Sequence, residues 1–298
     1  MADHDDVPDY HRASAPASTQ LPQQAEKLNL LLVTRGHPFD RDSFFDVFES
    51  NPDIQYSNVE HPAAQYMFNP EMAKKFDCYV QYDMPGIEFG SGAPKYFEPP
   101  EFYKEGVRAM GDAGCPLVIL HHCAAAWPAW PEWSEIVGGQ FLYTPMQSRG
   151  VDCLDSGYNI DVKHVVSPVL EHPITQGIEP FEIVDEVYLS QVFEDSVIPL
   201  FTSNWEFNRN NFYSAANVVI RGQLNCNKGW HHPSGSNVVG WIKTYKNAPV
   251  VYLQFGDGPE AYQNPNFRRI LAQAIQWAAS GEASSWAHET YKKSTRKG

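Results

Sequence analysis

The sequence predicts an α/β fold with a mainly parallel sheet, because two patterns alternate along its first half. Short, continuous apolar runs are followed by segments in which apolar residues recur at helical spacing. A strand of a parallel sheet carries such a run, since helices cover both faces of the sheet. The length of 298 residues and the apolar content of 43% are sufficient for one large α/β domain.

The first strand is expected over residues 28–34 (LNLLLVT), where the apolar run ends just before Gly36. A helix is expected over residues 42–50, because its three phenylalanines fall on one helical face. Asp40 or Asp42 could cap the first turn of this helix, and of the two we expect the carboxylate of Asp42 to do so.

Three further strands and a second helix complete the first half. Residues 77–82 (DCYVQY) and 117–121 (LVILH) are apolar runs typical of strands, and a weaker strand is expected near residues 54–59. Residues 101–113 repeat apolar side chains at helical spacing and end at Gly114, a residue type that favours helix ends. Strands and helices in this alternation form βαβ units with right-handed crossovers.

The last third of the chain returns to regular elements after a long polar stretch. Two strand-like runs, residues 237–245 and 249–255, are joined by a short turn, and residues 267–278 form a regular amphipathic helix. Residues 143–236 are polar and rich in glycine, asparagine and proline. We expect this stretch to be an irregular insertion whose short strands lie over the strand ends of the sheet.

The two ends of the chain are expected to lie outside the folded domain. Residues 1–26 are polar and lack large apolar groups, so we interpret them as a disordered N-terminal arm. Residues 283–298 end in a basic run and are interpreted as a solvated C-terminal tail. One α/β domain over residues 27–282 remains between them.

Charge and composition exclude several classes of function. With 22 basic and 36 acidic residues, the net charge of −14 is unfavourable for a nucleic-acid binder. No apolar stretch reaches the ~20 residues of a membrane span, and the acidic N-terminus is unlike a signal peptide. The sequence therefore predicts a cytoplasmic protein without nucleic acid or membrane as a partner. A small molecule and a second copy of the chain are the expected partners.

Polar residues that follow the predicted strands are the candidate functional residues, because ligands of open α/β sheets bind beyond the carboxyl ends of the strands. His37 and Asp40 follow the first strand, and His121 and His122 close the third apolar run. Imidazole and carboxylate groups bind divalent ions and also act as acid–base pairs. We expect His37, His121 and Glu186 to be the catalytic residues or metal ligands, with Asp40 and His122 behind them in the substrate site.

An unusual aromatic tract, residues 127–133 (WPAWPEW), follows His121 and His122. Sugar rings and aromatic substrates pack against such side chains, so Trp127 and Trp130 are expected to line the pocket together with Tyr188. The alternative is that a tryptophan of the tract anchors the next helix in the core.

Cys123 lies in the same turn and allows two interpretations. The five cysteines are scattered and never spaced as CxxC, so they predict neither a disulfide framework nor a zinc knuckle. Cys123 is interpreted as a packed thiol, because the turn lacks the glycines of a tight nucleophile turn. The alternative is a hydrolase in which Cys123 is the nucleophile.

Several stretches occur in the order typical of one protein family. They are Gly36-His37, residues 118–124, 130–141 (WPEWSEIVGGQF), 172–177 (HPITQG), 185–188 (DEVY), 249–256 and 264–279. In this order the sequence resembles the ThuA-like (trehalose utilisation) family, relatives of class I glutamine amidotransferases. The resemblance implies a flavodoxin-like, doubly wound sheet and a role in trehalose, keto-sugar or glycoside catabolism. It also implies that His121 occupies the position of the amidotransferase cysteine, and that a divalent metal accompanies some members.

The resemblance adds Asp257, which stands after Gly256 where the family commonly has histidine, to the substrate-binding candidates. We expect a lyase, isomerase or hydrolase of carbohydrate or keto-glycoside catabolism that removes a proton next to a carbonyl. A divalent metal such as zinc, or an imidazole, would stabilise the resulting enolate. No nucleotide cofactor is expected. The alternative from another class is a non-catalytic ligand-binding or interaction module on the same fold.

Overall fold

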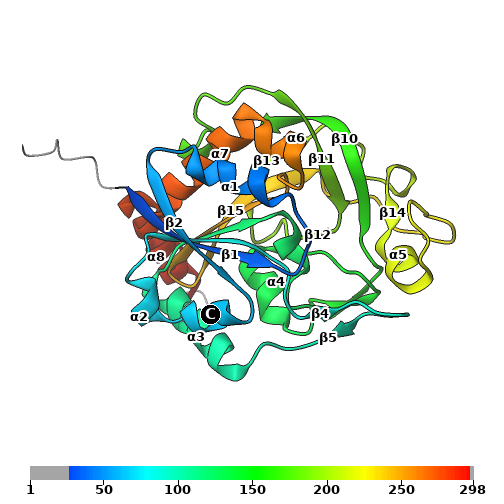
Figure 1. The fold of residues 1–298 in the computed structure, drawn as a ribbon, viewed down its shortest axis with the longest axis horizontal. Helices are drawn as coiled ribbons and strands as arrows, with labels where there is room; N and C mark the ends of the chain where they lie inside the picture. Colours follow the sequence, from blue (N-terminus) through cyan, green and yellow to red (C-terminus); the bar gives the residue numbers. More distant parts are fainter. Residues whose placement is uncertain (1–26, 296–298) are drawn as a thin grey trace, which may run out of the picture.

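The computed structural model describes residues 27–295 and contains a ten-stranded central sheet with helices on both faces (Figure 1). Five neighbouring strands are parallel, as the apolar runs predict, and the α/β fold is confirmed. In spatial order these are β2 (Ile54–Glu60), β1 (Leu28–Arg35), β3 (Cys78–Asp83), β6 (Leu117–Leu120) and β16 (Ala248–Leu253).

Two apolar cores separate the helices from the sheet. On one face, the phenylalanines of α1, the helix over residues 41–49, and the apolar side of α7, the helix over residues 265–278, pack in one cluster. On the other face, Tyr103 and Trp133 belong to a second cluster. The helices are α1 (Arg41–Glu49), α2 (Pro70–Ala73), α3 (Glu101–Ala113), α4 (Pro131–Val137), α5 (Ala215–Arg221), α6 (Pro259–Gln263), α7 (Pro265–Ala278) and α8 (Gly281–Thr295).

Asp40, and not Asp42, caps helix α1. The carboxylate of Asp40 accepts a hydrogen bond from the backbone N–H of Ser43 at 2.9 Å. Asp40 has extended backbone angles, whereas Asp42 already lies inside the first turn of the helix. The capping residue must precede the helix so that its side chain can accept the free N–H group of a residue two or three positions later, and Asp42 already lies inside the first turn.

The polar stretch over residues 143–236 enlarges the sheet. It contains the expected strands, but four of them belong to the central sheet in antiparallel pairing rather than lie over it. Burial alternates along the longest of them, the strand over residues 157–168, as in a strand with one solvated side. Such a strand has no continuous apolar run from which it could be predicted. The strands of this half are β15 (Val238–Tyr245), β13 (Ile198–Ser203), β10 (Gly157–Pro168), β11 (Phe181–Leu189) and β14 (Tyr213–Ser214).

Short elements connect these layers. Three two-stranded sheets pair β4 (Ile87–Glu88) with β5 (Lys95–Tyr96), β7 (Gly139–Gln140) with β12 (Gln191–Val192), and β8 (Met146–Ser148) with β9 (Val151–Cys153). The 3-10 turns are η1 (Ala63–Met67), η2 (His121–Ala125), η3 (Pro173–Thr175) and η4 (Arg209–Asn211).

The expected C-terminal tail is a helix through residue 295. Ala283 and Ala287 of α8 are fully buried, because two small side chains four residues apart let the helix pack closely on the domain. Residues 1–26, interpreted as a disordered arm, lie outside the described residues. Within residues 27–295, none of the helices has the length and apolar character that a membrane crossing requires.

Candidate functional site

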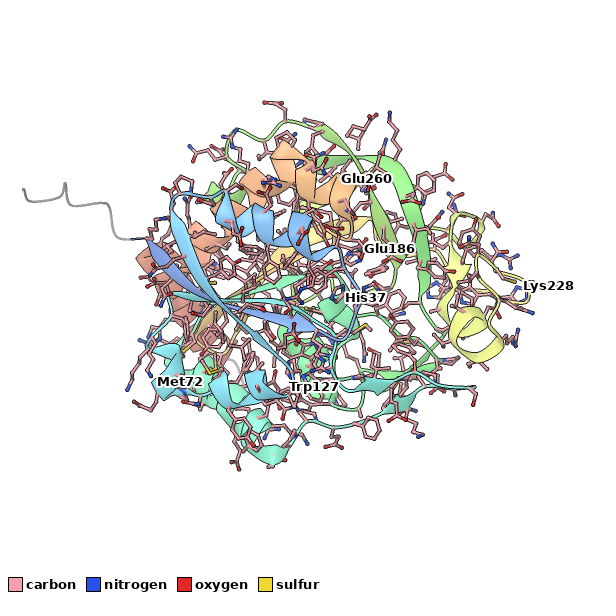
Figure 2. All side chains as sticks on the ribbon, viewed as in Figure 1. His37, Met72, Trp127, Glu186, Lys228 and Glu260 are labelled. Atoms are coloured by element: carbon pink, nitrogen blue, oxygen red, sulfur yellow. The ribbon has the colours of Figure 1, made fainter. Side chains whose placement is uncertain are left out.

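The candidate residues meet at the carboxyl ends of the parallel strands. His37 follows β1, His121 and His122 begin the turn η2 after β6, and Asp257 follows β16. Glu186 comes from β11 in the antiparallel half and reaches the same edge of the sheet (Figure 2). Residues that are far apart in sequence thus form one polar site, as expected for an open α/β sheet.

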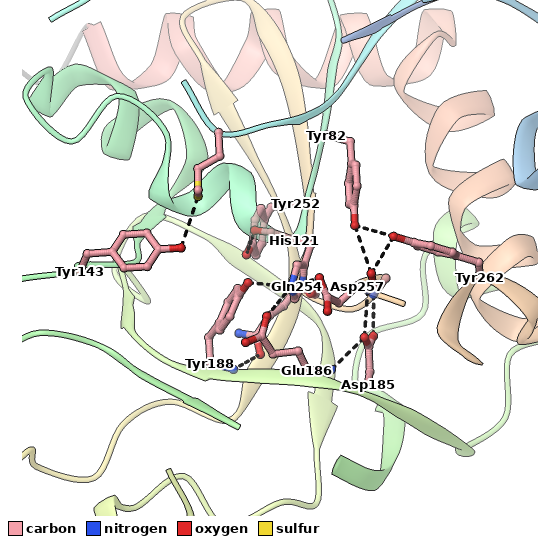
Figure 3. Close-up of polar contacts among 12 residues, drawn as sticks. Tyr82, His121, Tyr143, Asp185, Glu186, Tyr188, Tyr252, Gln254, Asp257 and Tyr262 are labelled. Carbon is pink, nitrogen blue, oxygen red and sulfur yellow. Dashed lines mark hydrogen bonds and ion pairs between the residues drawn. The ribbon is translucent and has the colours of Figure 1, made fainter. Parts of the chain in front are cut away.

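The imidazole of His121 is the centre of the first polar group (Figure 3). Its Nδ1 donates to the backbone oxygen of Gln254, and a carbonyl oxygen can only accept. Its Nε2 lies 3.0 Å from Oε2 of Glu186, 3.2 Å from Oδ1 of Asp257 and 2.6 Å from the Tyr188 hydroxyl. With Nδ1 protonated and two carboxylates at Nε2, this arrangement favours the imidazolium form.

The electrostatic balance of the first group agrees with this protonation state. Burial lowers the pKa of His121, but Asp257 and Glu186 outweigh it and hold this pKa well above its ordinary value. Burial raises the pKa of Asp257, whereas the neighbouring His121 brings it down to about 2. At neutral pH the site therefore contains an imidazolium beside an ionised Asp257.

The backbone at His121 is strained in the manner of a functional turn. His121 has a φ of +44°, in the left-handed region that non-glycine residues rarely adopt. His121 therefore takes the left-handed conformation that a glycine would ordinarily supply in such a turn. Hydrogen bonds to two backbone carbonyls of the turn stabilise it. The Tyr252 hydroxyl donates to the His121 carbonyl at 2.8 Å, and the Trp133 indole donates to the Cys123 carbonyl at 2.9 Å. Such strain costs about 1–3 kcal/mol and is concentrated at functional sites.

A second polar group consists of His37, His122 and Asp257. One nitrogen or oxygen of each lies within 4.8 Å of the others, and the two imidazole rings are 4.7 Å apart. His122 is 2% exposed, and neither of its ring nitrogens has a hydrogen-bond partner among residues 27–295. Burial, together with His37 and His121, holds the pKa of His122 well below its usual range. Imidazole nitrogens without hydrogen-bond partners beside a carboxylate fit a divalent cation.

The predicted catalytic and metal-ligand set is therefore divided between the two groups. His121 and Glu186 belong to the first group, and His37 belongs to the second with His122. Asp257, predicted only to bind substrate, is the member that both groups share.

Asp185 holds the loop that carries Asp257, the residue shared by the two groups. It was not among the predicted site residues. Its carboxylate accepts the backbone N–H groups of Gly256 at 2.6 Å and Asp257 at 2.9 Å (Figure 3). Burial raises the pKa of Asp185 to about 7, although the interactions with His121 and the two N–H groups act in the opposite direction. Asp185 precedes Glu186 in sequence, but no pattern in the chain links it to the loop after β16.

The aromatic neighbours of His121 differ in part from the predicted ones. Tyr188 lies against the imidazole as expected, at a ring distance of 4.6 Å. Trp127 and Trp130, in contrast, are each only 4% exposed and pack against Tyr103 in the core. This matches the alternative, in which the tract anchors local structure. Phe141, which the sequence did not indicate, contacts Tyr188 at 4.6 Å.

Two further candidates, Asp40 and Cys123, have surroundings typical of residues that stabilise the fold. Asp40 caps α1, and the hydrogen bonds from Ser43 lower the pKa of its carboxyl. Cys123 is fully buried, and its sulfur accepts the Asp83 backbone N–H at 3.0 Å. Burial raises the pKa of this thiol well above its usual range, which disfavours the thiolate that a nucleophile requires. The packed-thiol interpretation of Cys123 fits these surroundings.

Comparisons with known proteins agree with the fold. The family model for ThuA, described as trehalose utilisation, matches residues 47–278. A ThuA-like protein from Parabacteroides merdae has 16% sequence identity and a TM-score of 0.59, over 86% of this chain and 91% of that chain. One from Bacteroides uniformis has 15% identity and a TM-score of 0.54, over 90% and 96%. No curated protein matches the chain. Because the family match spans more than half of the sequence and confirms the resemblance, the chain belongs to the ThuA family.

Proposed function

We propose that this protein is an enzyme acting on a carbohydrate or keto-glycoside at the group formed by His121, Glu186 and Asp257. One observation carries the proposal: Nε2 of a fully buried His121 lies 3.0 Å from Glu186 and 3.2 Å from Asp257. A buried imidazole held between two carboxylates at the strand ends is suited to acid–base work. The description of the family as trehalose utilisation supports a sugar as the substrate.

The two partners have different roles in the proposed chemistry. A carbon–hydrogen bond next to a carbonyl breaks, and its proton passes to the Glu186 carboxylate, which is the more exposed of the pair with His121. The electron pair moves onto the carbonyl oxygen, and the His121 imidazolium stabilises the negative charge that develops there. Asp257 and Tyr188 hold the imidazole in place. Elimination, isomerisation or hydrolysis can follow from this enolate.

We include a divalent cation such as zinc in the proposal, held by His37, His122 and Asp257. The unpartnered nitrogens of His122 and the buried, unpartnered Nδ1 of His37 support these ligands. When bound, such an ion supplies Lewis-acid polarisation of a substrate oxygen. A cytoplasmic location and a homo-oligomer remain predictions from the sequence.

Hydrogen exchange at the substrate tests the common step without knowledge of the final product. A keto-glycoside is incubated with the metal-loaded protein in D2O, and incorporation of deuterium next to the carbonyl is followed by NMR. We expect Glu186→Gln to slow incorporation by about 10²–10⁴-fold, the usual contribution of a general base. Glu260→Gln, at an exposed glutamate of α6, is the matched control and leaves the rate unchanged. Equal rates in Glu186→Gln and the parent would contradict the proposal.

A further inference from the structure

A cavity of about 390 Å³ lies at the carboxyl ends of β1 and β2 and is lined by residues 35–39, Arg41 and Glu60. Its volume falls within the ~300–1,000 Å³ that is typical of small-molecule sites. His37 is among the lining residues and also belongs to the second polar group. The cavity therefore adjoins the candidate site, at the edge of the sheet where ligands of open α/β sheets bind.

The side chains that line this cavity make it locally positive. Arg35 and Arg41 both contribute a guanidinium, and Glu60 contributes the only carboxylate of the lining residues. An oxygen of Glu60 lies 3.0 Å from Nη1 of Arg41, so this carboxylate neutralises one of the two positive charges. The protein as a whole has a net charge of −14. A positive cavity beside the site thus differs from the general charge of the molecule and attracts anions locally.

Arg35 occupies a strained turn that is fixed by the neighbouring strand. Its φ of +102° lies in the region that favours glycine, and the next residue, Gly36, has a φ of +103°. The Met84 backbone N–H donates to the Arg35 carbonyl at 2.8 Å, and a Cβ on Gly36 would be only 2.3 Å from the Met84 oxygen. A non-glycine residue in such a conformation is unfavourable and is typical of ligand-binding and catalytic positions.

The guanidinium of Arg35 is positioned but retains free donors. Its Nη1 donates to the His61 carbonyl at 2.9 Å, and within residues 27–295 this is the one hydrogen bond that the side chain donates. A guanidinium carries five N–H donors, so most of them remain for a ligand. The Arg35 side chain is exposed, as access for a ligand requires.

Arg41 is held at the opposite side of the turn by aromatic contacts. Its Cζ lies 5.7 Å from the ring centre of Phe39, which also lines the cavity, and 5.1 Å from that of Phe45. Arg41 begins helix α1, but Asp40 already caps this helix. The donors that face the cavity are therefore those of the arginine side chains and not the N–H groups of the helix end.

We propose that this cavity binds an anionic group of the substrate, so that the substrate is a phosphorylated or carboxylated sugar rather than a neutral one. The planar fork of a guanidinium matches the paired oxygens of a phosphate or a carboxylate. An anionic group held there places the rest of the molecule beside His37 and the two polar groups. This inference rests on the proposed function, which assigns the reacting carbon to His121 and Glu186.

Calorimetric titration with inorganic phosphate, glucose-6-phosphate, glucuronate and glucose tests the inference. We expect one of the two charged sugars to bind at least about tenfold more tightly than glucose, and its identity distinguishes phosphate from carboxylate. Arg35→Gln should weaken this binding by about 10–100-fold, the loss expected for hydrogen bonds between charged groups, and leave the glucose affinity unchanged. Arg35→Lys keeps the charge without the fork, so its affinity should lie between those of Arg35→Gln and the parent.

Arg221→Gln is the matched control. Arg221 is exposed and, like Arg35, donates one hydrogen bond from Nη1, to Asn217 at 2.9 Å, but it lies at the end of α5. All four affinities should stay those of the parent in this variant. Thermal unfolding of Arg35→Gln at the parent temperature shows that weaker binding does not result from lost folding.

The possible results separate this inference from the proposed function. Equal affinity for charged and neutral sugars overturns the inference, as does a preference for charged sugars that Arg35→Gln leaves intact. A preference that disappears when EDTA removes the metal also overturns it, because a cation and not the arginines would then hold the anion. Phosphate binding that depends on Arg35, without binding of any sugar, retains the anion site and contradicts the carbohydrate function instead.

Discussion

Two polar groups, one around His121 and one around His122, share Asp257 but differ in whether the nitrogens of their buried histidine have hydrogen-bond partners. In the first, both nitrogens of His121 have partners, and two carboxylates favour its charged form. In the second, both nitrogens of the equally buried His122 lack partners within the described part of the chain, and its pKa is lowered. A buried polar atom without a partner costs about 1–3 kcal/mol. The contrast supports the proposal that the first group performs acid–base chemistry and that the second holds a cation.

The largest expected effect comes from removing the centre of the first group. His121→Gln is expected to lower the rate of substrate deuterium incorporation by about 10²–10⁴-fold, because the enolate loses its charged partner. Zinc titration of the same variant is the internal control, and the stoichiometry should remain that of the parent. Loss of zinc together with activity would show that the two groups are not separate.

Removing the second group should give the converse result. His122→Ala is expected to weaken Zn²⁺ binding by at least the ~10–100-fold that follows loss of a supporting residue at a metal site. Its free energy of unfolding without metal should fall by about 1–3 kcal/mol, because the cavity left by the buried ring outweighs the gain from removing two unpartnered nitrogens. The checks are competition with a metal-sensitive dye and urea denaturation. Parent-like zinc affinity in His122→Ala would rule out the proposed ligand set.

A buried histidine outside both groups gives a smaller, pH-dependent effect. Burial lowers the pKa of His164 on β10 to about 4. Because an unfolded histidine titrates near pH 6.5, the unfolded chain takes up a proton first, and stability falls on acidification below about pH 6.5. We expect His164 to account for about 2 kcal/mol of the stability lost between pH 7 and pH 5. Urea denaturation of His164→Gln at both values should show a smaller loss, and an equal loss would contradict the assignment.

The smallest effect is expected for the thiol that lies next to both groups in the sequence. Cys123→Ala should retain deuterium incorporation within about twofold and cost about 1 kcal/mol of stability, as for one buried contact. Iodoacetamide should leave Cys123 unlabelled in the folded parent, as determined by mass spectrometry of its peptides. Loss of turnover in a folded Cys123→Ala would instead favour the cysteine hydrolase.

Local sequence patterns were sufficient for the parallel half of the fold and for the histidines of both polar groups. Continuous apolar runs identified the parallel strands, and the polar residues after them included His37, His121 and His122. The antiparallel half was harder to predict, since a strand with one solvated side has no apolar run. The helix over residues 281–295 was not predicted, because two alanines are a weak signal in sequence and stabilise the helix only by packing on the domain.

The sequence by itself determined the fold class, the edge of the sheet that holds the site, and most of the residues in it. These features depend on the order of residues along each strand and turn. Only the tertiary structure decided how the residues are grouped, that Asp257 is shared, and that Trp127 packs in the core while Arg35 and Arg41 line one cavity. Those distinctions depend on distances between segments up to 220 positions apart, such as His37 and Asp257, and on which ring nitrogens have hydrogen-bond partners. No local pattern contains that information, because packing of the whole chain sets it.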